Sequence, residues 1–79
     1  MSIYSAKDAN GARRLVECIK FTDDDTIKLY KEKKLYFLEI QKMEETFIVN
    51  VIRQNKHLIQ FKDKNLQAAL FLAINFVYV

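Results

Sequence analysis

The hydrophobic pattern of this chain changes its period once, and that change limits the folds that the chain can form. Between residues 26 and 61, apolar side chains gather in four short runs that polar clusters separate, and most runs alternate apolar and polar residues. Runs of this kind, rich in β-branched and aromatic residues, are typical of β-strands. Because the connections between them are short, we expect an antiparallel meander. The four predicted strands are Thr26–Lys31, Leu35–Gln41, Thr46–Arg53 and His57–Phe61.

The last part of the chain has the period of a helix. Asp63 is its expected N-cap, because the carboxylate can accept a hydrogen bond from a free backbone N–H of the first turn. We expect this C-terminal helix to pack on one face of the meander, since an antiparallel sheet of this size needs a cover. The apolar residues at helical spacing are Leu66, Ala69, Leu70, Ala73, Phe76 and Val77.

The first 25 residues fit two structures. Ser5-Ala6-Lys7-Asp8 has the layout of a capping box, and the apolar residues after it fall on one helical stripe. This pattern favours a helix from about Ser5 to Cys18, before the sheet. Against it, Asn10-Gly11 is a hairpin signal, and residues 16–21 also fit a strand that runs into an acidic turn. Helix and hairpin both stay open for residues 5–21.

Length and composition indicate one α+β domain that spans residues 1–79. Hydrophobic residues make up 51% of the 79, which is enough for a packed core. The chain has no proline and one glycine, so it consists of regular elements joined by short polar turns. A single glycine also excludes a glycine-rich loop that could cradle a phosphate group.

The cysteine content and the hydropathy of the chain indicate its cellular compartment. Cys18 is the only cysteine, so no internal disulfide can form, whereas secreted chains this short usually depend on disulfides. The N-terminal residues lack the charged and apolar regions of a signal peptide. The longest uncharged run, residues 65–79, has 15 residues, and a membrane span needs about 20. We expect a cytoplasmic protein that does not enter membranes.

Few residues could carry catalysis. One histidine and one cysteine cannot assemble a zinc site of the usual type within one chain. We expect Cys18 to be a buried core thiol and His57 a surface imidazole, instead of a nucleophile and its base. Asp23, Asp24 and Asp25 form the one acidic cluster, but no glycine at the turn and no downstream glutamate complete a calcium loop. We interpret it as a solvated turn and expect no enzyme activity, metal or cofactor.

Positive charge is concentrated after residue 25. The formal net charge is +3, and residues 26–79 contribute +4, from nine lysines and arginines against five acidic residues. In an up-and-down meander the first and third turns lie at the same end of the sheet, so their cations would form a basic rim. Tyr30 and Tyr36 flank the first turn and could stack on nucleic-acid bases, although lysine-rich turns are also ordinary solubilising surface. The predicted rim consists of Lys31, Lys33, Lys34, Arg53 and Lys56.

The predicted sheet is apolar on both faces. Tyr36 and Leu38 lie on one face of their strand, and Leu35 and Phe37 lie on the other. One C-terminal helix cannot cover both faces, so we expect the second face to be covered by the N-terminal helix or by a partner subunit. The C-terminal helix is itself apolar nearly all round, which again favours association. The candidate interface residues are Tyr30, Tyr36, Leu72, Ile74 and Tyr78.

Two families have a similar order of elements or a similar pattern. A four-stranded meander followed by a helix resembles the small dimeric single-strand-binding proteins of the Whirly type, which implies a dimer that binds nucleic acid. A second resemblance, to the C-terminal domain of MecA-type protease adaptors, implies binding to other proteins. It rests on Leu29-Tyr30, Leu35-Tyr36-Phe37-Leu38, His57-Leu58-Ile59, Asn65-Leu66 and Ala69-Leu70.

The sequence therefore predicts a non-enzymatic binding module that acts as a homodimer. We expect its partner to be another protein, which it would serve as a small regulator, inhibitor or adaptor of phage or bacterial origin. The alternative is a single-stranded nucleic-acid-binding protein that uses the lysine-rich rim and exposed tyrosines. These two functions differ in where the apolar residues and the lysines lie on the folded sheet.

Overall fold

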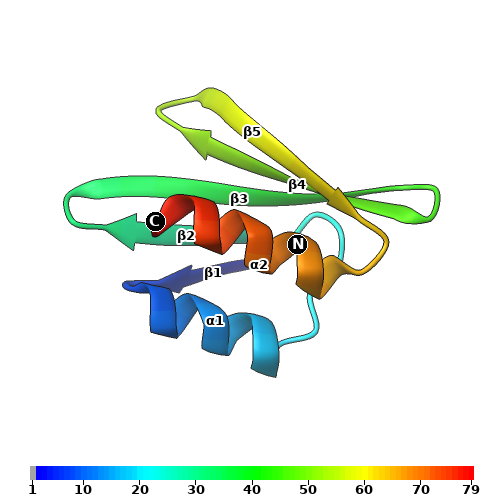
Figure 1. Ribbon diagram of the computed structural model, residues 1–79, viewed down its shortest axis with the longest axis horizontal. Coiled ribbons are helices and arrows are strands. Elements are labelled where there is room, and N and C mark those ends of the chain that lie inside the picture. Colours follow the sequence, from blue (N-terminus) through cyan, green and yellow to red (C-terminus); the bar gives the residue numbers. More distant parts are fainter. Residues whose placement is uncertain (1) are drawn as a thin grey trace.

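The computed structural model describes residues 2–79, which form one sheet and two helices (Figure 1). The α+β class and the C-terminal helix expected from the sequence are confirmed. In chain order the elements are β1 (Ile3–Ala6), α1 (Ala9–Cys18), β2 (Thr26–Lys31), β3 (Lys34–Met43), β4 (Thr46–Arg53), β5 (Lys56–Asp63) and α2 (Leu66–Val77).

The sheet has five strands in the spatial order β1-β2-β3-β4-β5. Strands β2 to β5 form the predicted antiparallel meander. The prediction of four strands is wrong by one, because β1 pairs with β2 in parallel orientation, from Ile3 opposite Thr26 to Ala6 opposite Leu29. Four residues are too few to show a clear alternation, and a parallel pair has no tight turn to mark it.

Helix α1 connects the two parallel strands. Asp8 is its N-cap, since the Asp8 carboxylate accepts a hydrogen bond from the backbone N–H of Gly11 at 2.7 Å. The N-terminal helix therefore exists, but it begins after Asp8 and not at Ser5, and the hairpin and strand alternatives are wrong. Gly11 suits this cap, because a Cβ atom at that position would lie only 3.2 Å from the Asp8 carboxylate.

Helix α2 is capped two residues later than the sequence indicated. The side chain of Asn65 accepts a hydrogen bond from the backbone N–H of Ala68 at 3.2 Å, so Asn65 is the N-cap. Asp63 ends β5 and accepts a hydrogen bond from the N–H of Asn65 at 2.8 Å. Asp63 therefore orients the capping residue and does not cap the helix itself.

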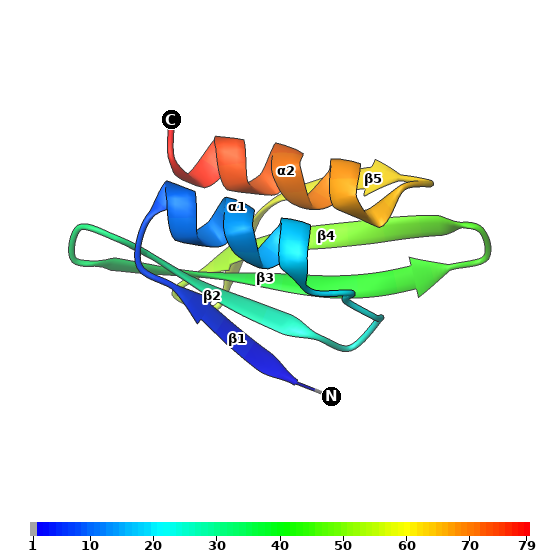
Figure 2. The ribbon, with the colours of Figure 1, turned by 90° about the horizontal axis from the view of Figure 1, so that it is seen from below.

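Both helices lie on the same face of the sheet (Figure 2), and the core forms between this face and the helices. Every second strand residue points into this layer, and the apolar stripes of the helices meet them. The sequence predicted that the N-terminal helix or a partner subunit covers the second face of the sheet. Helix α1 does not cover it, because it lies on the same face as α2. Central core residues are Ile27, Leu29, Leu38, Ile40, Val49 and Val51 of the sheet, Val16 of α1, and Ala69, Leu70 and Ala73 of α2.

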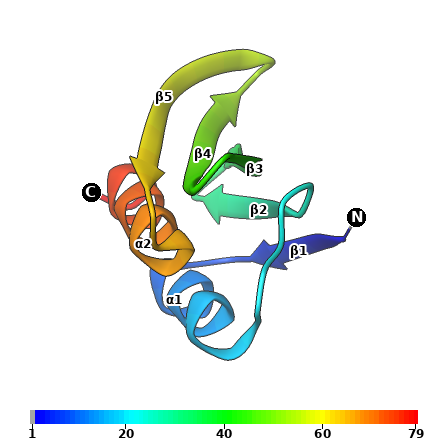
Figure 3. The same cartoon turned by 90° about the vertical axis from the view of Figure 1, so that its right-hand side faces the viewer.

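The sheet is strongly twisted. Seen along the long axis of the molecule, the tip of the β4–β5 hairpin swings to the side away from α2 (Figure 3). A bulge accompanies this bend, because Leu58 has no partner on β4 between the pairs Val51–Ile59 and Ile52–His57. The hairpin turns contain no glycine, and four of their residues adopt a left-handed φ of 53° to 62°. These four are Glu32, Glu44, Gln54 and Asn55.

Asp25 holds the loop before β2 against the start of β1. Its carboxylate is 5% exposed and accepts hydrogen bonds from the backbone N–H of Thr22 at 2.8 Å, the Thr22 hydroxyl at 3.3 Å and the backbone N–H of Ser2 at 3.1 Å. Asp23 and Asp24 are exposed, as a solvated turn requires. That interpretation is wrong for Asp25, because the loop folds back over its carboxylate.

We expect Asp25→Ala to lower the free energy of unfolding by about 2–3 kcal/mol, because three donors lose a charged acceptor. Urea denaturation of the purified protein measures this change. Asp23→Ala, in the same acidic cluster, serves as the control and should change stability by less than about 0.5 kcal/mol. Equal effects of the two substitutions would contradict the structural role of Asp25.

Candidate functional site

Within residues 2–79, the face of the sheet opposite the helices is covered by neither of them (Figure 2). We call it the open face. Because strand side chains alternate, each strand contributes every second residue to it. Strand β3 contributes the largest set, and β4 places Ile48, Asn50 and Ile52 next to that set. The β3 residues of the open face are Leu35, Phe37, Glu39, Gln41 and Met43.

The open face carries apolar side chains that water reaches. Leu35 and Phe37 are half-buried, while Ile48 and Ile52 are buried among their neighbours on this face. An apolar set on a sheet face without a covering layer is typical of an interaction surface. The most exposed members are Tyr30 at 40%, Leu58 at 46%, and Ile3 and Met43 at 63% each.

A chain of amide hydrogen bonds crosses the middle of the open face. The Asn50 Nδ2 group donates to Gln41 Oε1 at 3.0 Å, and the Gln60 Nε2 group donates to Asn50 Oδ1 at 2.7 Å. Asn50, at the centre of this chain, is only 2% exposed. Because both ends of its amide are paired, a polar residue can be buried there without loss of hydrogen bonds. The chain fixes three neighbouring strands relative to one another.

One end of the open face is hollowed and positively charged. This hollow has a volume of about 290 Å³ and lies between the β2–β3 turn and the β4–β5 turn. Leu35 and Phe37 give it apolar surface, its lining contains no acidic residue, and the Lys28 Nζ atom lies 6.0 Å from the centre of the Phe37 ring. We call it the basic hollow. It is lined by Lys33, Lys34, Leu35, Phe37, Arg53 and Gln54.

The basic hollow brings together three of the five residues of the predicted basic rim, Lys33, Lys34 and Arg53. Lys56 is exposed and stands opposite Arg53 in the β4–β5 register. Lys31 points elsewhere, because its Nζ atom donates to the backbone carbonyl oxygen of Val79 at 3.0 Å. The two turns lie at the same end of the sheet, as meander topology requires.

The two tyrosines expected to stack together lie on opposite faces of the sheet. Tyr30 belongs to the open face, whereas its neighbour across the strands, Tyr36, is opposite Leu29 and points to the helix side. The Arg53 guanidinium lies 5.8 Å from the centre of the Tyr36 ring. Tyr36 is therefore occupied within the fold, and Tyr30 is the one of the pair that a ligand can reach.

Ile74 is wrong as a candidate interface residue, because it is fully buried in the core. Helix α1 covers that side of α2, where the Gln67 Nε2 group donates to the backbone carbonyl of Val16 at 3.1 Å. Leu72 lies on the outer side of α2 and is 46% exposed. It remains available to a partner, but on the side of the molecule opposite to the open face.

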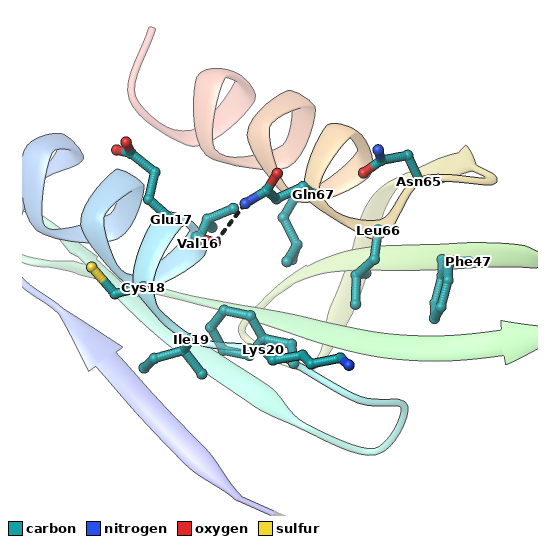
Figure 4. A pocket seen from close by; sticks show the side chains of 11 residues that line it. Val16, Glu17, Cys18, Ile19, Lys20, Phe47, Asn65, Leu66 and Gln67 are labelled. Carbon is teal, nitrogen blue, oxygen red and sulfur yellow. Dashed lines mark hydrogen bonds between the residues drawn. The ribbon is translucent and has the colours of Figure 1, made fainter.

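A groove that no sequence pattern indicated lies between the two helices (Figure 4). It has a volume of about 460 Å³ and lies between the C-terminal end of α1 and the N-terminal end of α2. Its lining comes from three segments far apart in the chain, so no local pattern could indicate it. Cys18 is on its rim and is exposed, which corrects the expectation of a buried thiol: it is the last residue of α1. The apolar lining is Val16, Ile19, Phe21, Phe47, Leu66 and Leu70.

The residues with catalytic potential stay apart. Cys18 ends α1 on the helix side, while His57 is exposed at the start of β5, paired with Ile52 of the open face. In the chain from residue 2 to 79, no group of three or more His, Cys, Asp or Glu side chains is placed to hold a metal ion.

Neither of the two helices in the described part of the chain has the length and apolar character needed to cross a membrane.

Comparison with known proteins gives no relative for this chain: no family model, no curated protein and no solved structure matches it. The resemblances to Whirly-type and MecA-type proteins therefore gain no support from outside the sequence.

Tyr78 ties the end of α2 to the sheet. Its hydroxyl group donates a hydrogen bond to the backbone carbonyl of Tyr30 at 2.7 Å. Burial raises the pKa of Tyr78 above its ordinary value of 10.0, and the negative charge of Asp8 adds to the effect. Both causes favour the neutral phenol, which is the form that can donate this bond. Tyr78 is therefore a structural residue and not a free interface residue.

We expect Tyr78→Phe to lower the free energy of unfolding by about 1 kcal/mol near neutral pH. Because folding raises the pKa of this tyrosine, the contribution is complete below pH 10.0, the unfolded value, and is lost as the pH rises through the folded pKa. Urea denaturation of both proteins at several pH values measures this. Tyr30→Phe keeps the carbonyl acceptor and is the control; a difference between wild type and Tyr78→Phe that is constant above pH 10 would count against the linkage.

Proposed function

We propose that this chain is a protein-binding module, without catalytic activity of its own, and that it binds its protein partner through the open face. The observation that carries the proposal is the position of both helices on one side of the sheet (Figure 2). It leaves exposed apolar side chains on the other side, among them Tyr30, Met43 and Leu58. Covering such side chains with a partner is favourable, since apolar surface is removed from water.

The composition of the open face supports a protein partner. Aromatic and methionine side chains are enriched in the centres of protein interfaces, and Tyr30, Phe37 and Met43 are of these types. The amide chain through Asn50 holds polar groups in fixed positions between the apolar ones. A face with apolar patches around a rigid polar centre can select a partner as well as bind it.

The role that suits such a module is that of a small regulator, inhibitor or adaptor that acts as a homodimer. A chain of this size can block or bridge surfaces of a target without carrying out chemistry. The free, exposed thiol of Cys18 supports a reducing compartment such as the cytoplasm. Cys18 and His57, which could in principle form a nucleophile and its base, lie on separate elements, and this supports a non-enzymatic role.

Two leucines of equal exposure test which face binds. Leu58 lies on the open face and Leu72 on the outer side of α2, and each is 46% exposed. We expect a protein partner captured from cells by the wild-type chain to be lost, by at least about tenfold, on Leu58→Lys. Capture by Leu72→Lys should equal that by wild type. Partner loss with Leu72→Lys alone would move the binding surface to the helix side.

A second candidate function, single-stranded nucleic-acid binding, is favoured by one observation. The lining of the basic hollow includes Lys33, Lys34, Arg53 and Phe37, and Tyr30 is exposed on the open face. Cations beside an aromatic surface can hold phosphates while a base stacks. Only one fully reachable ring lies there, however, because Tyr36 is on the other face.

Fluorescence anisotropy of labelled single-stranded DNA and RNA distinguishes the two functions. We expect no micromolar binding at about 50 mM salt, because three cations in one hollow are few for a phosphate backbone. Micromolar binding that weakens steeply between about 50 and 200 mM salt, and that Lys33→Ala with Lys34→Ala abolishes, would establish the second function in place of the first.

A further inference from the structure

The two ends of the open face are complementary to each other. At one end is the basic hollow, whose lining includes Lys33 and Lys34 beside Leu35 and Phe37. The guanidinium of Arg53, which also lines the hollow, lies 5.8 Å from the Tyr36 ring on the helix side. At the other end is the tip of the β3–β4 hairpin, where Met43 is 63% exposed and is followed by the exposed pair Glu44 and Glu45. An apolar side chain with two carboxylates beyond it matches an apolar surface with two lysines beside it.

These complementary groups cannot meet within one chain. Strand β3 runs from the hollow to the tip over ten residues, a span of about 30 Å. They can meet between two chains. The occupant that the open face fits on these grounds is therefore a second copy of the same protein, and each copy supplies one tip and one hollow.

We infer that two copies of this chain associate through their open faces, with residues 43–45 of each copy in the basic hollow of the other. The inference rests on the proposed function, because it names the partner of the same face. Met43 would lie against Leu35 and Phe37, where sulfur–aromatic contact is favourable. Glu44 and Glu45 would lie near the cations of the hollow.

Charge selects the symmetry of this dimer. Two stacked sheets can be related by a two-fold axis that runs along the strands or by one that runs across them. The first axis places one basic hollow over the other, which brings like charges together. The second places each hollow over the acidic tip of the other copy and forms two identical contacts, so the assembly closes at two copies.

The residue spacing on β3 agrees with an axis across the strands near Glu39. Residues 33 and 45 are equally distant from residue 39 along the strand, as are residues 35 and 43. Lys33 then comes over Glu45 of the other copy, and Leu35 over its Met43. Glu39 of the two copies would meet near the axis, and this repulsion favours a reversible dimer over a permanent one.

A contact of standard size would take only a part of the surface of this chain. A stable protein interface of standard size buries about 800 Å² on each partner. That is about one seventh of the 5383 Å² of accessible surface of this chain. The molecule extends 36 by 28 Å along its two longest axes, which lie in the plane of Figure 1.

A charge-swap experiment tests the inference. We would prepare Lys33→Glu with Lys34→Glu, in which both ends of the open face are acidic, and Glu44→Lys with Glu45→Lys, in which both are basic. Light scattering at tens of micromolar gives the mass of each protein alone and of an equal mixture. Lys7→Glu with Arg14→Glu, at exposed positions of the α1 region, is the control with the same change of charge as the acidic variant.

We expect the wild type and the control to have twice the mass of one chain, and each charge variant alone to have the mass of one chain. The equal mixture should recover the dimer, because each acidic end then meets a basic one, and this recovery also shows that both variants are folded. A charge variant that stays dimeric, a mixture that stays monomeric, or masses that grow with concentration beyond two copies would overturn the inference. A monomeric wild type that still loses its captured partner on Leu58→Lys would overturn the second copy as partner and leave the proposed function standing.

Discussion

The parallel pairing of β1 with β2 is the constraint on which the rest of this structure depends. Parallel neighbours cannot be joined by a tight turn, so the chain between them must cross over the sheet, and α1 makes that crossing. The crossing places α1 on the face that α2 also covers, and Gln67 joins the two helices through the Val16 carbonyl. Both helices therefore lie on one face of the sheet, and neither of them covers the other face.

The sequence predicted the parts of the fold that local pattern controls. Alternating apolar and polar residues predicted the meander, and apolar residues at helical spacing predicted α2. Both patterns repeat over enough residues to be distinguished from chance. Strand β1 was missed because its four residues depend on a partner more than twenty residues away. Turn positions were predictable from charged clusters, but their conformation was not: Glu32 and Glu44 adopt left-handed φ values where glycine is the usual residue.

The candidate site was also predictable only where local pattern or strand topology determines it. Meander topology alone put Lys33, Lys34 and Arg53 at one end of the sheet, and the structure has them around one hollow. Which tyrosine faces outward follows from the register, and a one-residue change in register would place Tyr30 directly opposite Tyr36, on the same face. The burial of Ile74 and the groove between the helices depend on how α1 and α2 pack together. Such contacts join segments that are distant in the chain, so no local sequence pattern predicts them.

The order of pairing along the chain also bears on how the protein folds. Strands β2 to β5 are joined by turns of two residues, so their pairing closes short loops. The pairing of β1 and the bond from Tyr78 to the Tyr30 carbonyl close far longer ones, of 23 residues for Ile3 with Thr26 and 48 for the tyrosines. Loop closure disfavours distant contacts until local ones exist. The meander is thus the part that can assemble first, while β1, although it precedes the meander in the chain, can pair only once β2 has formed.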